Sequence, residues 1–388
     1  MSKKIIHILC HTIRNDKDML YHVNGGFGAK HAKGLLPYLP KYKYEAWYMV
    51  LGLDRSRVIK RDGITYRLYP ARSLSKVFES YFGLIRSSEL FRALSKLDIN
   101  HTIVHFQGER GSILHDLLIK FPNLKVALQY HGYGQPQWLE WLEAMFITPF
   151  EKIYFRKIKH FFVPIRSRVS YLKNRLHIPS EKISFENIGI DFDLFKPGNR
   201  IKARKILNIP SKSFVITYVG PLIKSKGVDK IISAYQDLSK KHSHIFLLLI
   251  GGGKTDPLYS QAVKKADKVI GYIPNQSMPV YYQATNVLCF YGNQKMRKYA
   301  GPGIAPTEAL ACNINVISTN LHHFPDKINQ EIGLIPTDQN DLLRKLDFLI
   351  SKPEFRFKAR NKIAPYVAYS QISKSIGKTY DKLLKSPF

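Results

Sequence analysis

The sequence predicts an α/β protein of two domains, each built around a parallel, doubly wound sheet. Short β-rich runs alternate with helical stretches from one end of the chain to the other. Several of these runs are apolar without interruption, as at 214–219, and such runs are typical of strands buried on both faces of a parallel sheet. A chain of 388 residues is too long for one ordinary core and suits two domains of roughly 150–200 residues.

The expected strands form two sets, with helical stretches between successive strands, as doubly wound units require. The first set covers 4–9, 44–50, 64–69, 102–106, 125–130 and 160–163. The second set covers 214–219, 245–250, 268–270, 287–289, 315–318 and 332–335.

The domain boundaries follow from the segment between the two sets. Residues 187–200 are rich in Gly, Asp, Asn and Pro, which predicts a link. We therefore expect an N-terminal domain over 1–186, a link over 187–200 and a second domain over 201–368. Apolar residues recur at helical spacing near the end of the chain, so an amphipathic helix is expected within 369–388.

The charge is strongly basic, with 60 Lys and Arg against 29 Asp and Glu and a formal net charge of +31. A field of this sign favours polyanions, which include nucleic acid, an anionic membrane and phosphorylated substrates. A solvated basic surface without a specific partner is the alternative. Spread-out lysines without a recognition motif argue against a nucleic-acid partner.

The cellular setting is expected to be cytoplasmic. The three cysteines, Cys10, Cys289 and Cys312, lie far apart and match no metal spacing or disulfide framework, which suits a reducing compartment. The first apolar stretch is too short for a secretion signal. No run approaches the roughly 18–20 apolar residues that span a bilayer, so the protein is expected to be soluble, or peripheral on the inner face of the membrane.

The loop after the predicted strand 214–219 carries the first candidate site residues. It starts at Gly220 and brings Lys224 and Lys226 to a helix that begins near Val228. Ligands of an open α/β sheet bind beyond the carboxyl ends of the strands. A lysine at that place neutralises a diphosphate as a point charge. The alternative is an ordinary turn that contains Gly and Lys.

A second candidate is the segment 300–311, with the sequence AGPGIAPTEALA. Its Gly and Pro residues allow a close approach of the backbone to a ligand, and a helix is expected from Ile304 or Ala305. Unpaired N–H groups at a helix N-terminus bind phosphate oxygens. Glu308, about one turn into the helix, is placed to accept hydrogen bonds from ribose hydroxyls. Alternatively it only favours the positive helix end, an effect of a few tenths of a kcal/mol.

These segments together resemble the group 1 retaining glycosyltransferases, which form family four of the GT-B enzymes. The resemblance covers nearly the whole chain and rests on ordered matches at family spacing. The matching segments are 25–28, 62–70, 130–132, 187–197, 219–234, 249–253, 270–286 and 300–319. The glycine cluster at 25–28 lacks the G-x-G-x-x-G spacing of a dinucleotide fingerprint and by itself indicates only a turn.

The resemblance implies a GT-B architecture, in which two Rossmann-like domains face an interdomain cleft. It also implies transfer of a hexose from a nucleotide-diphosphate sugar to a glycan or lipid-linked acceptor, with retention of configuration and without a metal or other cofactor. A C-terminal helix that packs back on the N-terminal domain is implied as well.

The resemblance further implies roles for individual residues. Lys226 corresponds to the lysine of the donor phosphates, and Glu308 to the glutamate that holds the ribose. Gly303 and Ile304 would donate amides to the diphosphate, and Ile273 would meet the base with its backbone. His131 corresponds to the histidine near the donor sugar and is the candidate catalytic residue. The two remaining donor-binding candidates are Gly26 and Gly220.

Two departures from the family pattern concern the donor site. The family's arginine after the strand glycine is Pro221 here, and the first glutamate of its Glu-x-seven-Glu pair is Ala300. The lost cation has possible replacements at Lys224, Lys295, Arg297 and Lys298. The alternative function is therefore a catalytically degenerate GT-B protein that serves as a binding or partner subunit.

A membrane-docking surface is expected between Trp138 and Lys182. Apolar residues from Trp138 to Phe146 follow helical spacing, and 152–182 contains nine basic residues interleaved with aromatic ones. An aromatic helix beside a basic stretch suits an anionic membrane surface. The alternative is that the aromatic residues pack in the interior and the basic ones are solvated.

Overall fold

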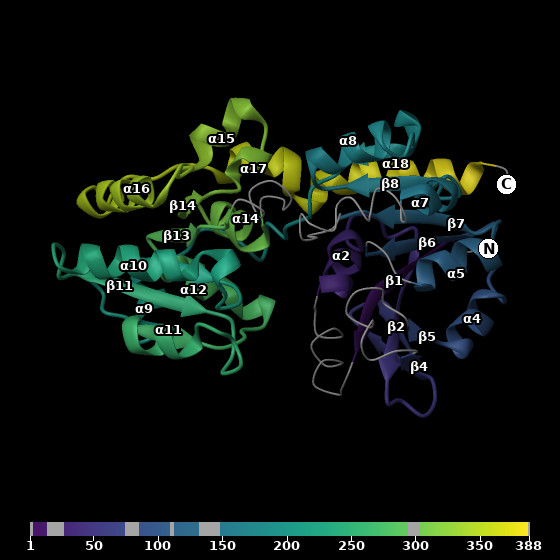
Figure 1. The fold of residues 1–388 in the computed structure, drawn as a ribbon, viewed down its shortest axis with the longest axis horizontal. Helices are drawn as coiled ribbons and strands as arrows, with labels where there is room; N and C mark the ends of the chain where they lie inside the picture. The colour runs from purple at the N-terminus through teal and green to yellow at the C-terminus, as the bar shows by residue number, and fades with distance from the viewer. Residues whose placement is uncertain are drawn as a thin grey trace. The chain divides into compact units, whose positions relative to one another are not determined.

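The computed structural model describes residues 3–13, 27–73, 85–108, 112–131, 148–293 and 303–386. The chain divides into two compact units (Figure 1). Unit 1 comprises Met1–Gly189 together with Tyr369–Phe388, and unit 2 comprises Ile190–Ala368.

Unit 1 is built on a sheet with the order β3-β4-β2-β1-β6-β7-β8-β9. The strands are β1 Lys4–Ile13, β2 Lys43–Leu51, β3 Arg57–Arg61, β4 Ile64–Ser73, β5 Ile85–Arg86, β6 Thr102–Gln107, β7 Lys125–Gln129, β8 His160–Val163 and β9 Ile183–Phe185. The pairs are parallel except that β3 and β5 run antiparallel to β4.

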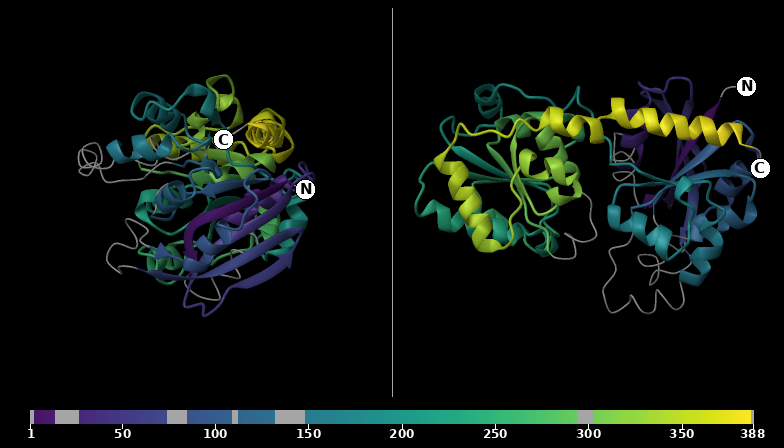
Figure 2. Two further views of the ribbon diagram at one scale, coloured as in Figure 1. Left: turned by 90° about the vertical axis from the view of Figure 1, so that its right-hand side faces the viewer. Right: turned by 90° about the horizontal axis from the view of Figure 1, so that it is seen from above.

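Helices cover both faces of this sheet, because successive strand residues point to opposite sides and both sides are apolar. One face packs against α4 Ser88–Leu94, α5 Ser112–Lys120, α7 Thr148–Phe155 and α8 Arg166–Asn174, and the other against α2 Phe27–Leu35 and α18 Tyr369–Lys385. Figure 2 shows α18, the yellow helix that ends at the C-terminus, lying along unit 1.

The start of α18 is held by Tyr369, whose ring occupies space that glycines leave free. A Cβ on Gly34 would lie 2.1 Å from this ring, and one on Gly189 would lie 2.2 Å from it. The hydroxyl of Tyr369 donates to the carbonyl oxygen of Lys30 at 3.2 Å. Further along α18, the apolar stripe of Ile372, Ile376, Tyr380 and Leu383 is buried.

Unit 2 has a five-stranded, entirely parallel sheet with the order β12-β11-β10-β13-β14. Its strands are β10 Phe214–Val219, β11 Ile245–Ile250, β12 Lys268–Ile270, β13 Val287–Phe290 and β14 Asn315–Ser318. The chain leaves β10 in one direction and returns to its other side at β13, so the topological switch point lies between these two strands.

The helices of unit 2 connect these strands and follow them. They are α9 Arg200–Ile206, α10 Val228–Ser239, α11 Tyr259–Lys265, α12 Met278–Ala284, α14 Ile304–Ala311, α15 Asp326–Ile332, α16 Gln339–Ser351 and α17 Arg360–Val367. Two apolar clusters that share the sheet residues form its core. The predicted α/β class with doubly wound parallel sheets is therefore confirmed.

The predicted strand at 332–335 is wrong. Ile332 ends α15, and Leu334 pairs with Ile317 only through an isolated bridge. Gly333 breaks the stretch, since a Cβ there would lie 2.6 Å from the carbonyl oxygen of Val316. Strands β3, β5 and β9 were not expected, because they are short or mostly exposed and lack an apolar run.

The segment 187–200 was expected to be a link, but its residues pack within the two units. The amide of Ile190 donates to the carbonyl oxygen of Val367 at 2.7 Å, and Phe195 is fully buried in the core of unit 2. The guanidinium of Arg360 donates to the carbonyl oxygens of Phe192 and Phe195. Unit 2 thus begins at Ile190, before the predicted boundary.

Three histidine rings lie together between the sheet of unit 1 and its helices, with His7 stacked on His105 and His31 of α2 edge-on to both. The ring centroids of His7 and His105 are 4.9 Å apart, and that of His31 lies 5.9 and 5.4 Å from them. His105 Nδ1 is 2.6 Å from the hydroxyl of Tyr380, and His7 Nδ1 is 2.9 Å from the amide nitrogen of Gln107. Among the described residues, the Nε2 atoms of all three rings lack a hydrogen-bond partner.

Burial keeps these rings neutral. It lowers the pKa of His31 to about 4, and it lowers the pKa values of His7 and His105 well below the usual range. Burial also lowers the pKa of His160 at the start of β8 to about 4. An unfolded chain protonates the same groups near their ordinary pKa of about 6.5. As the pH falls below that value, unit 1 loses stability, because its unfolded state binds more protons than its folded state.

We predict that the free energy of unfolding of unit 1 falls steeply between pH 6.5 and pH 4, since each buried histidine contributes up to about 1.4 kcal/mol per pH unit. All three tryptophans precede residue 189, so tryptophan fluorescence in a denaturant titration reports on unit 1. The variant His31→Gln is expected to reduce the slope by the share of one histidine. An unchanged slope in this variant would contradict the assignment.

Candidate functional site

The site residues predicted in unit 2 lie at the carboxyl edge of its sheet, on loops that contact one another through backbone atoms. Gly220, directly after β10, has a φ of 150° and donates its amide to the carbonyl oxygen of Ile250 at 2.8 Å. After β11, Gly251 packs so closely that a Cβ on it would lie 2.8 Å from the carbonyl oxygen of Gly220. These glycines bring the ends of β10 and β11 together without side chains between them.

Lys226 is held at the switch point by the residue that follows it. Gly227 has a φ of 73°, and a Cβ there would lie 1.7 Å from the carbonyl oxygen of Tyr291, just beyond β13. The amide of Asn293 also donates to the carbonyl oxygen of Ser225 at 3.1 Å. The short helix Lys224–Lys226 is therefore pressed against the carboxyl end of β13.

The ammonium group of Lys226 is half-buried in this position. Its Nζ lies 5.7 Å from the centroid of the Phe290 ring. Burial lowers its pKa from the ordinary value. Among the described residues no carboxylate forms an ion pair with it. A partly desolvated cation without a counter-ion favours an anionic ligand.

Gly303 and Ile304 form the start of α14, as predicted. Gly303 has a φ of 83°, and its carbonyl oxygen accepts from the hydroxyl of Thr307 at 2.6 Å. Pro306, in the first turn, carries no N–H. The amides of Ile304 and Ala305 therefore remain as donors at the helix N-terminus, which is the arrangement that binds phosphate oxygens.

Glu308 is almost fully buried, with 3% of its surface exposed. Its Oε1 accepts from the amide of Asn275 at 2.9 Å, and its Oε2 accepts from the hydroxyl of Tyr282 at 2.8 Å. Tyr282 lies on α12, and Asn275 begins the short helix Asn275–Ser277 after β12. Burial, with the nearby Glu308 carboxylate, raises the pKa of Tyr282, so its hydroxyl stays a donor. The carboxylate is fixed from two sides.

Ile273 lies in the loop after β12, two residues before Asn275. Its side chain packs against the core of unit 2, while Tyr272 beside it is 59% exposed. The bond from Asn275 to Glu308 connects this loop to α14. The fold thus gathers Gly220, Lys226, Ile273, Gly303, Ile304 and Glu308 around the carboxyl edge of one sheet.

Two predicted site residues, His131 and Gly26, belong to unit 1. His131 is half-buried and follows β7 by two residues. It lies close enough to His31 that its charge adds to the effect of burial in lowering the pKa of His31. Gly26 lies outside the described residues, as do Ala300, Lys295, Arg297 and Lys298.

Sequence reasoning missed Asn275, Tyr282 and Gly227. The first two act on Glu308 across 33 and 26 residues of chain, and no local pattern marks such a contact. Gly227 was visible in the sequence, but its role depends on the carbonyl group of Tyr291. Pro221, at the position of the missing arginine, is exposed, and its carbonyl oxygen accepts from the hydroxyl of Tyr218 at 2.6 Å.

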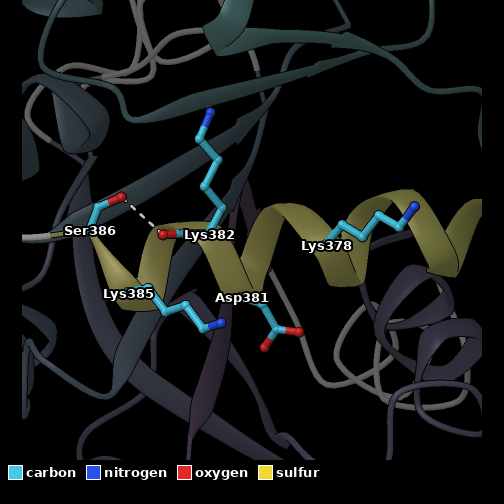
Figure 3. Close-up of a pocket in the computed structure, with 5 residues that line it drawn as sticks. All are labelled: Lys378, Asp381, Lys382, Lys385 and Ser386. Atoms are coloured by element: carbon cyan, nitrogen blue, oxygen red, sulfur yellow. Dashed lines mark hydrogen bonds between the residues drawn. The ribbon is translucent and has the colours of Figure 1, made fainter.

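A shallow pocket in unit 1 is separate from these residues. It is lined at the C-terminal end of α18 by Lys378, Asp381, Lys382, Lys385 and Ser386 (Figure 3). Asp381 already pairs with Lys3 and Lys41 and accepts from the hydroxyl of Tyr42 at 2.9 Å. None of these residues was a predicted site residue, and no catalytic chemistry follows from them.

Three aromatic residues of the expected membrane-docking surface lie in the core, whereas Tyr154 and Tyr171 are half-buried, and docking through this stretch stays a prediction. Phe155, Phe161 and Phe162 are fully buried in unit 1. Basic residues flank them in the sequence, but these three side chains are buried because β8 and the end of α7 pack on the core. The stretch from Trp138 to Phe146 lies outside the described residues.

No helix in the described ranges is long and apolar enough to cross a membrane. No group of His, Cys, Asp and Glu residues in these ranges is arranged to hold a metal ion.

Comparisons with known proteins agree with the geometry of unit 2. Residues 199–366 match the family model for glycosyl transferases group 1. The chain is similar to the capsular polysaccharide biosynthesis glycosyltransferase CapM of Staphylococcus aureus, with 26% identity over 43% of this chain and 45% of that protein. It is also similar to the D-inositol 3-phosphate glycosyltransferase of Saccharomonospora viridis, with 25% identity over 43% of this chain and 42% of that protein. The matches thus span less than half the length of these relatives.

Solved structures share the fold of the whole chain. The sucrose-phosphate synthase of Thermosynechococcus elongatus has a TM-score of 0.71 at 18% identity, covering 98% of this chain and 99% of its own. The Anabaena protein HepE, solved in complex with UDP and glucose, has a TM-score of 0.67 at 12% identity, covering 98% of this chain and 99% of its own. Residues 199–366 therefore match the group 1 glycosyl transferases, and the whole chain has the GT-B fold of these solved structures.

Proposed function

We propose that the protein is a glycosyltransferase that moves a hexose from a nucleotide-diphosphate sugar to a glycan or lipid-linked acceptor with retention of configuration. The observation that carries this proposal is that two groups occur at the same sheet edge. One is Lys226, which has no ion pair among the described residues, and the other is Glu308, which Asn275 and Tyr282 hold in place. The glycosyltransferase names of the relatives support the reaction class. The UDP and glucose in the HepE complex support a donor of that type.

In this proposal the diphosphate binds between Lys226 and the N-terminus of α14. Lys226 supplies a cation, and Ile304 with its neighbour supplies amides. Gly220 and Gly303 allow the ligand to approach the backbone because they have no Cβ. As the sugar leaves, negative charge develops on the diphosphate, and these fixed donors stabilise it. Since the protein supplies this charge, we propose that the transfer needs no metal and proceeds in the presence of EDTA.

Glu308 would hold the ribose. An ionised carboxylate has about four acceptor positions, and Asn275 and Tyr282 use one on each oxygen. These two donors orient the carboxylate, which would accept from a ribose hydroxyl in this proposal. Ile273 would meet the base through its backbone. His131 remains the predicted catalytic residue.

The alternative of a catalytically degenerate binding protein gains no support from the described residues. It was motivated by Pro221 and Ala300. The positions of Lys226 and Glu308 at one sheet edge support an active donor site in spite of these two departures.

We predict that Lys226→Gln and Glu308→Gln each weaken UDP binding by about 10- to 150-fold, because each removes a charge-assisted contact of about 1.5–3 kcal/mol. Titration calorimetry measures this loss. Lys230→Gln on α10 removes an exposed lysine outside the site and is the matched control. Wild-type affinity in both site variants would contradict the assignment.

A thermal-shift panel with UDP-, GDP- and ADP-sugars then identifies the nucleotide. A ligand at about 100 times its dissociation constant adds about 2.7 kcal/mol to the stability of the folded state. No stabilisation by any of these donors would contradict the proposed function.

We further predict that Tyr282→Phe weakens binding of UDP about fivefold, since it removes one hydrogen bond that fixes Glu308, worth about 1 kcal/mol. Binding of 2′,3′-dideoxy-UDP, which offers no ribose hydroxyls, is expected to change much less. Tyr281→Phe makes the same substitution at the preceding position of α12 and serves as control. Equal losses for both nucleotides would indicate a general structural defect instead.

A further inference from the structure

We propose that α9 and the segment 352–358 of unit 2 form a surface that docks on an anionic phospholipid membrane. This surface, called the α9 surface below, contains Arg200, Ile201, Lys202, Lys205 and Ile206 of α9, with Phe348, Lys352, Phe355, Arg356 and Lys358. It differs from the stretch between Trp138 and Lys182, and it does not depend on the proposed donor site.

The outer face of α9 exposes large aliphatic side chains between lysines. Ile201 is 71% exposed and Ile206 is 60% exposed, whereas Ala203 is buried. Lys205 lies one turn after Ile201, and Ile206 lies one turn after Lys202, so isoleucine and lysine share each row of this face. These two isoleucines of a seven-residue helix are exposed and do not pack in the core of unit 2.

The end of α16 and the segment after it add aromatic and basic side chains. Phe355 and Phe348 are 37% and 39% exposed, and their ring centroids are 5.5 Å apart. Lys352 Nζ lies 5.1 Å from the centroid of the Phe348 ring. Exposed rings that carry an ammonium group on one face suit a boundary between apolar and polar media.

The two parts lie next to each other. Arg356 is close enough to Arg200 and Arg204 that its charge adds to burial in lowering the pKa values of both, that of Arg200 to about 10. The buried Nε of Arg200 has no hydrogen-bond partner among the described residues. A phosphate group at this surface would relieve the repulsion between the guanidinium groups.

The charge of this surface fits an anionic partner. From Lys196 to Lys212 the chain has six Lys or Arg and no Asp or Glu, and from Lys352 to Lys362 it has five Lys or Arg and one acid, Glu354. Basic side chains near an anionic bilayer contribute about 1 kcal/mol each. The isoleucines favour a membrane over nucleic acid, because aliphatic side chains enter the acyl boundary while lysines stay among the headgroups.

The α9 surface lies at the amino edge of the unit 2 sheet, opposite the proposed donor site. Arg204 donates to the carbonyl oxygen of Ala284 and to Asn286, which precedes β13. Asn315, the first residue of β14, bonds the carbonyl oxygen of Phe355 and the amide of Phe357. Docking through this edge leaves Gly220 and Lys226 at the other edge accessible.

The test is co-sedimentation of the full chain with vesicles of phosphatidylcholine alone or with about one third phosphatidylglycerol, over a range of salt. We expect binding only to the anionic vesicles, and less of it as salt rises. Lys202→Glu/Lys205→Glu should reduce the partition coefficient at least about 25-fold, since each lost lysine corresponds to about fivefold. Ile201→Ser/Ile206→Ser should reduce it about tenfold without changing the salt dependence.

Matched controls separate docking from general charge and from misfolding. Lys264→Glu/Lys327→Glu makes the same charge change on α11 and α15 and should bind as wild type does. All variants should keep the wild-type melting temperature, since the substituted side chains are exposed. UDP binding by these variants is measured separately, so failure of the donor site and failure of the docking surface are distinguishable.

Three results would overturn the proposal. One is equal binding to neutral and anionic vesicles. Another is an equal loss in the control variant. The third is binding of a single-stranded oligonucleotide that depends on Lys202 and Lys205 while wild type ignores the vesicles, which would indicate a nucleic-acid partner.

Discussion

At the carboxyl edge of the unit 2 sheet, the backbones of neighbouring loops contact each other directly, and the proposed site depends on this contact. A Cβ on Gly227 would lie 1.7 Å from the carbonyl oxygen of Tyr291, so no other residue fits while the loops keep this approach. Gly220 and Gly251 also approach each other closely, because neither residue has a side chain. Because the loops are held together, Lys226 stays half-buried at the switch point. No carboxylate in the described ranges forms an ion pair with it, so its charge is available to a ligand.

The sequence could predict what is local or periodic. Five of the six strands expected in unit 2 begin where predicted, because buried parallel strands are continuous apolar runs. The start of α14 at Ile304 was predictable from Gly303 and its prolines. The partners of Glu308 were not, since Asn275 and Tyr282 meet it only once β12, α12 and α14 have packed. The burial of Phe161 and Phe162 in β8 could not be predicted, because a mixture of aromatic and basic residues does not distinguish a buried strand from an amphipathic surface.

Buried polar groups have different consequences in the two units. Glu308 in unit 2 is buried with donors on both oxygens, so its position is fixed and it can serve a ligand. His7, His31 and His105 of unit 1 are buried, and in the part of the chain that the structure describes their Nε2 atoms have no hydrogen-bond partner. Burial keeps these rings neutral, so they destabilise unit 1 as the pH falls. The arginines near α9 are an intermediate case, in which backbone carbonyls satisfy Arg204 but not the Nε of Arg200.

The placement of α18 has a consequence for how the chain is made. Unit 1 consists of two stretches of chain, and unit 2 is inserted between them, entering at Ile190 and leaving at Ala368, which pair with each other. The ring of Tyr369 fills the space above Gly34 and Gly189, but Tyr369 is translated 180 residues after Gly189. During synthesis unit 2 can complete its core first, whereas the part of the unit 1 sheet face that α18 covers stays exposed until that helix leaves the ribosome.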